Sequence, residues 1–203
     1  MKRIVCFGDS ITAASGAHEG GRWTGRLQRQ LDDRMGDGWQ VYNRGIGGNT
    51  TWQALDRFDT DVKPLLPAYV LIEYGFNDGS VPEGRRIPRC GLPAFRENLA
   101  EIVRMVRAGK GRPILVVNHP ITDTKTGQGN GRTYLRNFSP YQPAIRDVAK
   151  TTKTPAIDLE RDMTKAKVNL KYLLAEDGLH LSPLGQGIYA DFIFSGLCRI
   201  IQR

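Results

Sequence analysis

The chain has little cysteine, little histidine and no long apolar run. Its three cysteines, Cys6, Cys90 and Cys198, are odd in number and lack metal-ligand spacing, which argues against a disulfide framework and indicates reduced thiols. No apolar run approaches the length that crosses a bilayer, so we expect no membrane insertion. The three histidines are dispersed, so no metal or other cofactor is expected.

The N-terminal segment does not fit a secretion signal. It reads Met-Lys-Arg-Ile-Val-Cys-Phe, and its apolar run ends at Gly8 after four residues. Such a run is far shorter than the apolar core of a signal peptide. We therefore expect a cytoplasmic protein, with non-classical release or association with a phage particle as alternatives.

Positive charge is in excess across the 203 residues, whose formal net charge is +8. The length favours a single domain over residues 1–203. Basic residues are denser in 22–34, 85–89 and 104–112, which we interpret as solvated helix faces and loops. The alternative is a surface that attracts an acidic polymer. No nucleic-acid motif accompanies the charge, so nucleic acid is not an expected partner.

Predicted strands and helices alternate along the whole chain. Alternation of this kind indicates a parallel sheet with helices on both faces, which is a three-layer α/β/α sandwich of about five strands. The predicted strands are 3–7, 39–43, 69–74, 114–117 and 155–158, and the predicted helices are 22–35, 51–58, 93–108, 139–150 and 183–201. Loops are predicted at 43–50, 75–79, 79–92 and 121–137, the last of them mobile.

Polar, glycine-flanked sequences follow four of these strands. They are Gly8-Asp9-Ser10, Gly47-Gly48-Asn49, Gly75-Phe76-Asn77-Asp78 and Asn118-His119. Ligands bind at the carboxyl ends of strands in open α/β sheets, so these segments should converge on one crevice. A serine there needs an imidazole base and a carboxylate to orient it, and residues 177–180, Asp-Gly-Leu-His, supply both groups.

Four sequence blocks resemble the SGNH or GDSL hydrolase family, and they occur in that family's order. They are Phe7-Gly8-Asp9-Ser10-Ile11-Thr12, the segment 43–50, Gly75-Phe76-Asn77-Asp78 and Asp177-Gly178-Leu179-His180. The resemblance implies a flavodoxin-like fold in which Ser10 is the nucleophile, His180 the base and Asp177 its orienting carboxylate. It also implies an oxyanion hole formed by the Ser10 N–H, the Gly48 N–H and the Asn77 amide, with Gly45 and Gly47 as close rivals of Gly48.

Structural roles remain as alternatives for several of these residues. Ser10 could cap a helix, Asn77 could serve a turn, and His180 could be a polar residue that precedes a helix. Asp9 is interpreted as structural. Trp23 either packs in the core or stacks on a sugar beside Ser10, and His119 ends a strand at the same edge, so both are candidate substrate-binding residues.

The layout from Trp23 to Gly79 is similar to the branch of this family that removes acetyl groups from polysaccharides. We therefore predict a serine esterase that works through an acyl-enzyme and removes O-acetyl or short acyl groups from a carbohydrate. The predicted partner is a small-molecule or polysaccharide ester. The alternatives are a lysophospholipase or acyl thioesterase, and a non-catalytic polysaccharide-binding module on the same fold. Loops 79–92 and 121–137 are rich in Gly, Thr, Asn and Arg, which suits hydroxylated or anionic ligands better than lipids.

Overall fold

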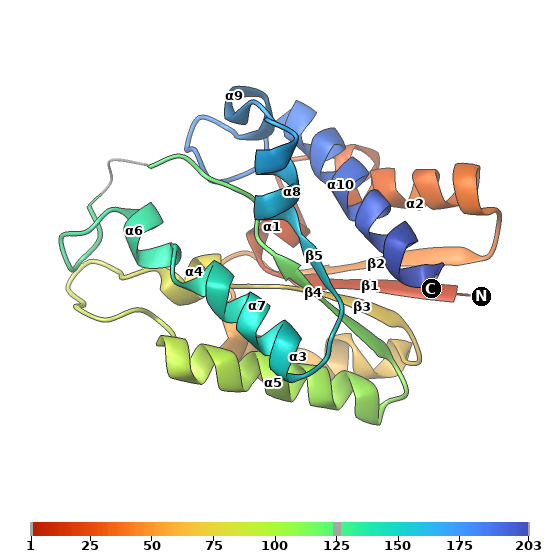
Figure 1. Ribbon diagram of the computed structural model, residues 1–203, viewed down its shortest axis with the longest axis horizontal. Helices are drawn as coiled ribbons and strands as arrows, with labels where there is room; N and C mark the ends of the chain where they lie inside the picture. The colour runs from red at the N-terminus through yellow and green to blue at the C-terminus, as the bar shows by residue number, and fades with distance from the viewer. Residues whose placement is uncertain (1, 124–126, 203) are drawn as a thin grey trace.

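A five-stranded parallel sheet forms the centre of the computed structural model, which describes residues 2–123 and 127–202 (Figure 1). Its strands lie in the order β2-β1-β3-β4-β5, as in flavodoxin-like folds. Because the order reverses at β1, a crevice opens at the carboxyl ends of β1 and β3. The strands are β1 (Lys2–Gly8), β2 (Trp39–Gly45), β3 (Tyr69–Glu73), β4 (Arg112–Val117) and β5 (Ala156–Asp158).

Helices cover both faces of the sheet, which confirms the predicted three-layer sandwich (Figure 1). One layer holds α2 (Trp23–Met35), α8 (Leu159–Lys165) and α10 (Pro183–Ile201), with α10 packed along α2. The other layer holds α3 (Thr51–Asp61), α5 (Leu92–Ala108) and α7 (Tyr141–Thr151), with α5 between its two neighbours. In the described part of the chain, no helix combines the length and the apolar character needed to span a bilayer.

The core fixes the central strand most firmly. Residues 4–7 of β1 have no exposed surface, because helices cover them from both faces. Helix α5 buries a stripe of apolar side chains against the sheet, namely Phe95, Leu99, Ile102, Val103 and Val106. Each such side chain contributes about 1.5–3 kcal/mol when fully buried. The strand that leads into Ser10 is therefore a rigid support.

Most predicted boundaries differ from the structure by one or two residues, and three differences lie in or next to the segments that follow β2 and β3. Strand β2 runs to Gly45 instead of ending at residue 43, because Gly45 still pairs with Gly8 on β1. Helix α3 extends past residue 58 to Asp61. Residues 76–79, predicted as loop, form the short helix α4 (Phe76–Gly79), which starts after Gly75 at a φ of +131° that favours glycine.

Several short elements were not predicted. A helix of a few residues shows too little of a 3.6-residue period to be recognised in a sequence. Helix α6 lies inside the 121–137 stretch that was predicted to be a mobile loop, and residues 124–126 of that stretch lie outside the described residues. Residues 80–91 have no helix or strand, as predicted. The unpredicted elements, besides α4 and α8, are α1 (Ser10–Ala13), η1 (Glu19–Gly21), η2 (Lys63–Leu65), α6 (Tyr134–Phe138) and α9 (Leu170–Leu173).

Candidate active site

Ser10 is the first residue of α1, directly after the central strand. The Asp9 carboxylate caps this helix by accepting a hydrogen bond from the Ile11 N–H at 2.9 Å. A Cβ on Gly8 would collide with the Thr12 hydroxyl and the Glu73 carbonyl, so only glycine allows the chain to turn this tightly. Ser10 itself remains half-buried at the carboxyl end of β1, with its hydroxyl available to a base.

A serine, a histidine and an aspartate form one hydrogen-bonded line. Ser10 Oγ lies 2.9 Å from His180 Nε2, and His180 Nδ1 lies 2.6 Å from Asp177 Oδ2. With a carboxylate at Nδ1, the neutral ring keeps its proton there and turns the Nε2 lone pair toward the serine hydroxyl. The structure thus brings together residues that are 170 positions apart in the chain.

A short hairpin-like arm, residues 174–181, holds Asp177 and His180. Leu174 and Leu181 form an antiparallel bridge at its base, and the Ala175 N–H donates to the His180 carbonyl at 2.7 Å. The arm reverses direction at Gly178, whose φ is +70°. Asp177 Oδ1 also accepts from the N–H groups of Leu179 and His180, each at 2.9 Å. The spacing of three residues therefore suffices to fix the carboxylate and the imidazole together.

The Asp177 carboxylate keeps its charge although it is partly covered. Burial acts to raise the pKa of Asp177, but the hydrogen bonds from the His180 ring and from two backbone N–H groups outweigh it, and the pKa lies below its ordinary value. The Asp177 side chain is 51% exposed and the His180 side chain 44%. The imidazole therefore has an ionised partner and open access to solvent.

Of the glycines at the end of β2 and just after it, Gly45 has a structural role, whereas Gly47 and Gly48 are candidates for the oxyanion hole. A Cβ on Gly45 would overlap the backbone of Ala13, and the Gly45 N–H already donates to Asn43 Oδ1 at 2.9 Å. Gly48 has a φ of +76° and open space around the position of a Cβ, so its conformation and not crowding calls for glycine. Among described residues, the N–H groups of Gly47 and Gly48 have no acceptor, so these two remain candidate donors.

The Asn77 side chain is hydrogen-bonded to Asp9, the residue directly before Ser10. Its Nδ2 donates to Asp9 Oδ2 at 3.1 Å, which uses one of the two amide hydrogens. The next residue, Asp78, accepts from the N–H and the hydroxyl of Thr51 at 2.9 and 2.6 Å. Helix α4 is therefore tied on one side to the segment that holds Ser10 and on the other to the start of α3.

A second carboxyl group lies beside Asp9. Glu73 ends β3, is 2% exposed, and accepts from the Thr12 hydroxyl at 3.0 Å and from the Asn118 amide at 2.6 Å. Burial, together with the neighbouring Glu73 carboxylate, raises the pKa of Asp9, and burial raises the pKa of Glu73 to about 7. Two buried carboxyl groups in hydrogen-bonding reach of each other are expected to share one proton at neutral pH.

His119 does not contact substrate, contrary to the sequence-based prediction. It has no exposed surface, and its ring packs against Phe76 and Tyr189. Its Nε2 lies 2.9 Å from the Leu179 carbonyl. Burial lowers the pKa of His119 to about 4, so the ring is neutral and donates the Nε2 proton to that carbonyl. His119 therefore anchors the arm that carries His180.

Trp23 is also wrong as a substrate-stacking residue, because it is 2% exposed. Its indole Nε1 donates to the Ile11 carbonyl at 2.9 Å, and its backbone N–H donates to Gln186 Oε1 at 2.9 Å. The ring packs against Tyr189. The alternative that placed Trp23 in the core is the correct one, since apolar contact and a buried donor are both satisfied there.

Glu73 is the main feature that sequence reasoning missed. A signal was present, because a lone carboxylate at the end of the apolar strand Tyr-Val-Leu-Ile-Glu is costly to bury without partners. The role of Asp9 toward Asn77 was missed as well, since the two residues are 68 positions apart. Within residues 2–123 and 127–202, no group of three or more His, Cys, Asp or Glu side chains is arranged to hold a metal ion.

Comparisons with known proteins agree with this geometry. The model of the GDSL-like lipase/acylhydrolase family matches residues 6–188. The uncharacterized lipoprotein YqeF of Bacillus subtilis (strain 168) is 31% identical, over 98% of this chain and 90% of its own length. The isoamyl acetate-hydrolyzing esterase 1 homolog of Mus musculus is 30% identical, over 99% of this chain and 82% of its own.

A solved structure has the same fold as this chain. The crystal structure of the lipase/acylhydrolase from Enterococcus faecalis superposes with a TM-score of 0.80 at 27% identity, over 97% of this chain and 95% of that one. The family model, the relatives and this structure cover the strands, the arm and the loops that carry the line from Ser10 to Asp177. The chain is therefore a carboxylic ester hydrolase that belongs to the GDSL-like lipase/acylhydrolase family.

Proposed function

We propose that this chain is a serine esterase that removes acetyl or other short acyl groups from a carbohydrate through an acyl-enzyme. The observation that carries the mechanism is the line Ser10 Oγ, His180 Nε2, His180 Nδ1 and Asp177 Oδ2, joined at 2.9 and 2.6 Å. These are hydrogen-bonding distances for a nucleophile, its base and the group that orients the base.

In the first half of the proposed reaction, His180 Nε2 takes the Ser10 proton as Oγ attacks the ester carbonyl carbon. The carbonyl oxygen gains negative charge and accepts hydrogen bonds from the Ser10 N–H, the Gly48 N–H and the free hydrogen of the Asn77 amide. Gly47 is the rival of Gly48, since its N–H is equally free. The C–O bond then breaks, and the imidazolium gives its proton to the leaving alcohol.

In the second half, water attacks the Ser10 ester. His180 takes a proton from this water, the acid is released, and the proton returns to Ser10 Oγ. Asp177 stabilises the imidazolium in both halves, which its low pKa favours because the carboxylate stays ionised. Donors aimed at the oxyanion are usually the largest catalytic contribution.

Two observations support a short acyl group on a polar alcohol. A relative 30% identical to this chain is described as an isoamyl acetate-hydrolyzing esterase homolog, and isoamyl acetate carries an acetyl group. In addition, the segments 80–91 and 127–137 beside α4 present arginine, asparagine and glycine. Such groups suit a hydroxylated alcohol better than an acyl chain.

A lipolytic activity is the second candidate. Ile46 is 45% exposed directly before Gly47, and Leu184 is 67% exposed four residues after His180. These two side chains could contact a longer acyl chain held near Ser10. The two candidates differ in the acyl length that the enzyme prefers.

The test is an acyl-chain series on purified protein. We expect kcat/KM to be highest for the p-nitrophenyl esters of two- and four-carbon acids, and acetate to be released from acetylated oligosaccharides. A maximum at eight carbons or more, without acetate release, would favour the lipolytic candidate. Ser10→Ala should abolish turnover and labelling by a fluorophosphonate. Turnover that survives this substitution would overturn the mechanism, and absence of turnover in the parent protein would favour a binding module.

A further inference from the structure

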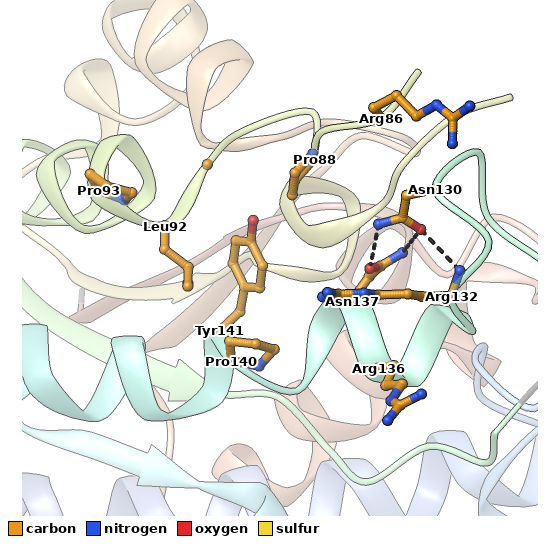
Figure 2. Close-up of a pocket in the computed structure, with 11 residues that line it drawn as sticks. Arg86, Pro88, Leu92, Pro93, Asn130, Arg132, Arg136, Asn137, Pro140 and Tyr141 are labelled. Carbon is orange, nitrogen blue, oxygen red and sulfur yellow. Dashed lines mark hydrogen bonds between the residues drawn. The ribbon is translucent and has the colours of Figure 1, made fainter. Parts of the chain in front are cut away.

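A basic pocket lies beside helix α4, outside the line from Ser10 to Asp177. Its volume is about 520 Å³, and it is formed by the segments 86–93 and 130–141 (Figure 2). Three arginines, Arg86, Arg132 and Arg136, line it together with Asn130 and Asn137. Figure 2 also shows the rings of Pro88, Pro93, Pro140 and Tyr141 on its wall. Among the residues that the structure describes, no aspartate or glutamate lines the pocket.

The Tyr141 hydroxyl donates to the Cys90 carbonyl at 2.6 Å and so joins the two segments that form this pocket, and the residues just before each segment are hydrogen-bonded as well. The Val81 N–H donates to Gln128 Oε1 at 2.7 Å, and the Gly129 N–H donates to the Val81 carbonyl at 3.0 Å. A Cβ on Gly129 would overlap the carbonyls of Pro82 and Arg85, so glycine allows this close approach. Asn130 and Asn137 exchange amide hydrogen bonds at 3.0 and 3.1 Å (Figure 2). The pocket therefore has fixed walls.

Its positive charge is not neutralised by the protein. The guanidinium groups of Arg86, Arg132 and Arg136 make no ion pair or hydrogen bond with any described residue. An adjoining recess of about 420 Å³ adds Arg85 and Arg89. Glu83 is the one acidic residue of the segment 80–91, and it lines neither hollow. The guanidinium groups of Arg85 and Arg89 also have no ion-pair partner among the described residues, and five such neighbouring cations create a local potential that attracts anions.

Short hydrogen bonds connect this pocket to the helix that carries Asn77. The Cys90 N–H donates to the Asp78 carbonyl at 3.0 Å, and the Arg89 N–H donates to the Ser80 carbonyl at 2.9 Å. From the other segment, the Tyr134 hydroxyl donates to the Phe76 carbonyl at 2.6 Å. The pocket walls and the candidate oxyanion donor are thus held by the same four-residue helix.

We propose that this pocket binds an acidic group, a carboxylate or a sulfate, on the carbohydrate whose ester is cleaved at Ser10. This inference rests on the proposed function and specifies its substrate as an acidic saccharide. Arginine presents paired N–H donors that match the oxygens of such anions. The asparagine amides suit sugar hydroxyls, and the volume falls within the usual range for ligand pockets.

The lining favours a saccharide over the other common polyanions. Single-stranded nucleic acid binds through bases stacked on exposed aromatic rings. Tyr141 is the aromatic residue of the pocket, and it is only 1% exposed. An anionic membrane would need apolar side chains to insert, and Ile87 alone protrudes from this region, at 73% exposure.

The test measures binding to a protein that cannot turn over its ligand. In a Ser10→Ala background, calorimetry compares tetragalacturonate, its fully methyl-esterified neutral form and a sulfated tetrasaccharide. We expect the acidic forms to bind at least ten-fold more tightly than the neutral one, and more weakly as NaCl rises. The two acidic probes distinguish a carboxylate ligand from a sulfate ligand.

A matched pair of triple variants identifies the residues. Arg86→Gln, Arg132→Gln and Arg136→Gln together should weaken acidic binding roughly 10-fold or more, since each partly exposed ion pair contributes up to about a five-fold factor. Arg104→Gln, Lys150→Gln and Lys165→Gln remove the same charge from exposed sites elsewhere and should change binding less than two-fold. In the active enzyme, kcat/KM for acetylated acidic over acetylated neutral oligosaccharides should fall by the same factor in the first variant only.

Several results would overturn the pocket assignment. They are equal binding of charged and neutral probes, an equal loss in both triple variants, or tighter binding of oligo-dT or of phosphatidylglycerol vesicles through the same arginines. Because calorimetry requires no turnover, failure of this proposal is distinct from failure of the proposed function. If the enzyme hydrolysed acetyl esters but did not distinguish acidic from neutral saccharides, the esterase proposal would stand and the proposal for this pocket would be wrong.

Discussion

Two regions bring carboxyl groups to the site, and they do so in opposite surroundings. Asp177 lies on the exposed arm 174–181, where local hydrogen bonds keep its pKa low. Asp9 and Glu73 lie under the nucleophile without solvent contact, and burial raises the pKa of both. The arm therefore keeps an ionised carboxylate next to the His180 imidazole, whereas the buried pair Asp9 and Glu73 keeps a carboxyl proton inside the protein.

The difference separates two tasks of the site. The arm supplies the base, His180, with its carboxylate partner three positions earlier in the chain, and His119 anchors the arm to the fold through the Leu179 carbonyl. The buried pair positions the elements of the site. Asp9 accepts hydrogen bonds from the Ile11 N–H and the Asn77 amide and thereby holds α1, which begins at Ser10, and α4 in place. Changes in the arm should alter rate with little effect on stability, and changes in the buried pair should alter stability as well.

The largest effect is expected from His180→Ala. Loss of the base should lower kcat for p-nitrophenyl acetate by roughly 10⁴- to 10⁶-fold. The side chain is half-exposed, so urea denaturation should give a free energy of unfolding within about 0.5 kcal/mol of the parent value. His18→Ala removes another exposed imidazole and serves as the control, with a rate close to that of the parent. A rate loss below ten-fold for His180→Ala would contradict the proposed mechanism.

Asn77→Ala tests the candidate oxyanion donor that Asp9 holds in place. Removal of one oxyanion donor should lower kcat on the order of 100- to 1,000-fold, because the interaction strengthens in the transition state. KM should change little, since the ground-state ester carries less charge on its oxygen. Steady-state kinetics on p-nitrophenyl acetate separates the two constants. A rise in KM at constant kcat would mean that Asn77 holds the substrate and not the transition state.

Glu73→Gln tests the buried proton through the pH dependence of stability. In the folded chain Glu73 keeps its proton up to a pKa of about 7, whereas its ordinary value is 4.5. The free energy of unfolding should therefore fall as pH rises from about 4.5 to 7. The lowered pKa of Asp177 acts below its ordinary 3.8, outside this window. Glutamine has no proton to lose, so the slope should become shallower in the variant, and the part that remains comes from Asp9, whose pKa burial also raises.

Urea denaturation at pH 5, 6, 7 and 8 measures this slope directly. Asp33→Asn offers a control, because Asp33 is an exposed carboxylate on α2. Its slope should equal that of the parent. If Glu73→Gln also retained the parent slope, the shared proton between Asp9 and Glu73 would be refuted.

His119→Phe is expected to give the smallest effect. The substitution keeps a buried ring but removes the donor to the Leu179 carbonyl, leaving that carbonyl unsatisfied at a cost of about 1–3 kcal/mol. The arm should then hold His180 less firmly, and kcat should fall several-fold at constant KM. His119→Gln, which restores a donor, should recover part of the rate. Equal rates for the phenylalanine and glutamine variants would show that the hydrogen bond does not position the arm.

The sequence was sufficient to predict those features that depend on residues close together in the chain. The strand β1 and the helix α5 follow from apolar periodicity, and the pair Asp177 and His180 from its spacing of three. The line from Ser10 to His180 was anticipated through the resemblance to the SGNH or GDSL family, because Ser10 follows a strand but His180 lies on an arm outside the sheet.

Features that depend on burial were not accessible from sequence. Sequence left Trp23 open between the core and the crevice and placed His119 at the crevice, and the folded chain buries both. Glu73 was absent from the predicted site because its partners, Thr12 and Asn118, approach only in the folded sheet. The choice among Gly45, Gly47 and Gly48 required knowing that the Gly45 N–H is already used by Asn43.

Trp23 has a further consequence for the order in which activity arises during synthesis. Its indole binds the carbonyl next to Ser10, and its backbone binds Gln186 on the helix that follows His180. Trp23 therefore links the segment of Ser10, which is synthesised early, to the helix that follows His180, which is synthesised late. A ribosome-bound chain that has not yet released residues 177–186 holds a serine without a partner. Ester hydrolysis should therefore begin only after residues 177–186 have emerged and folded against Trp23.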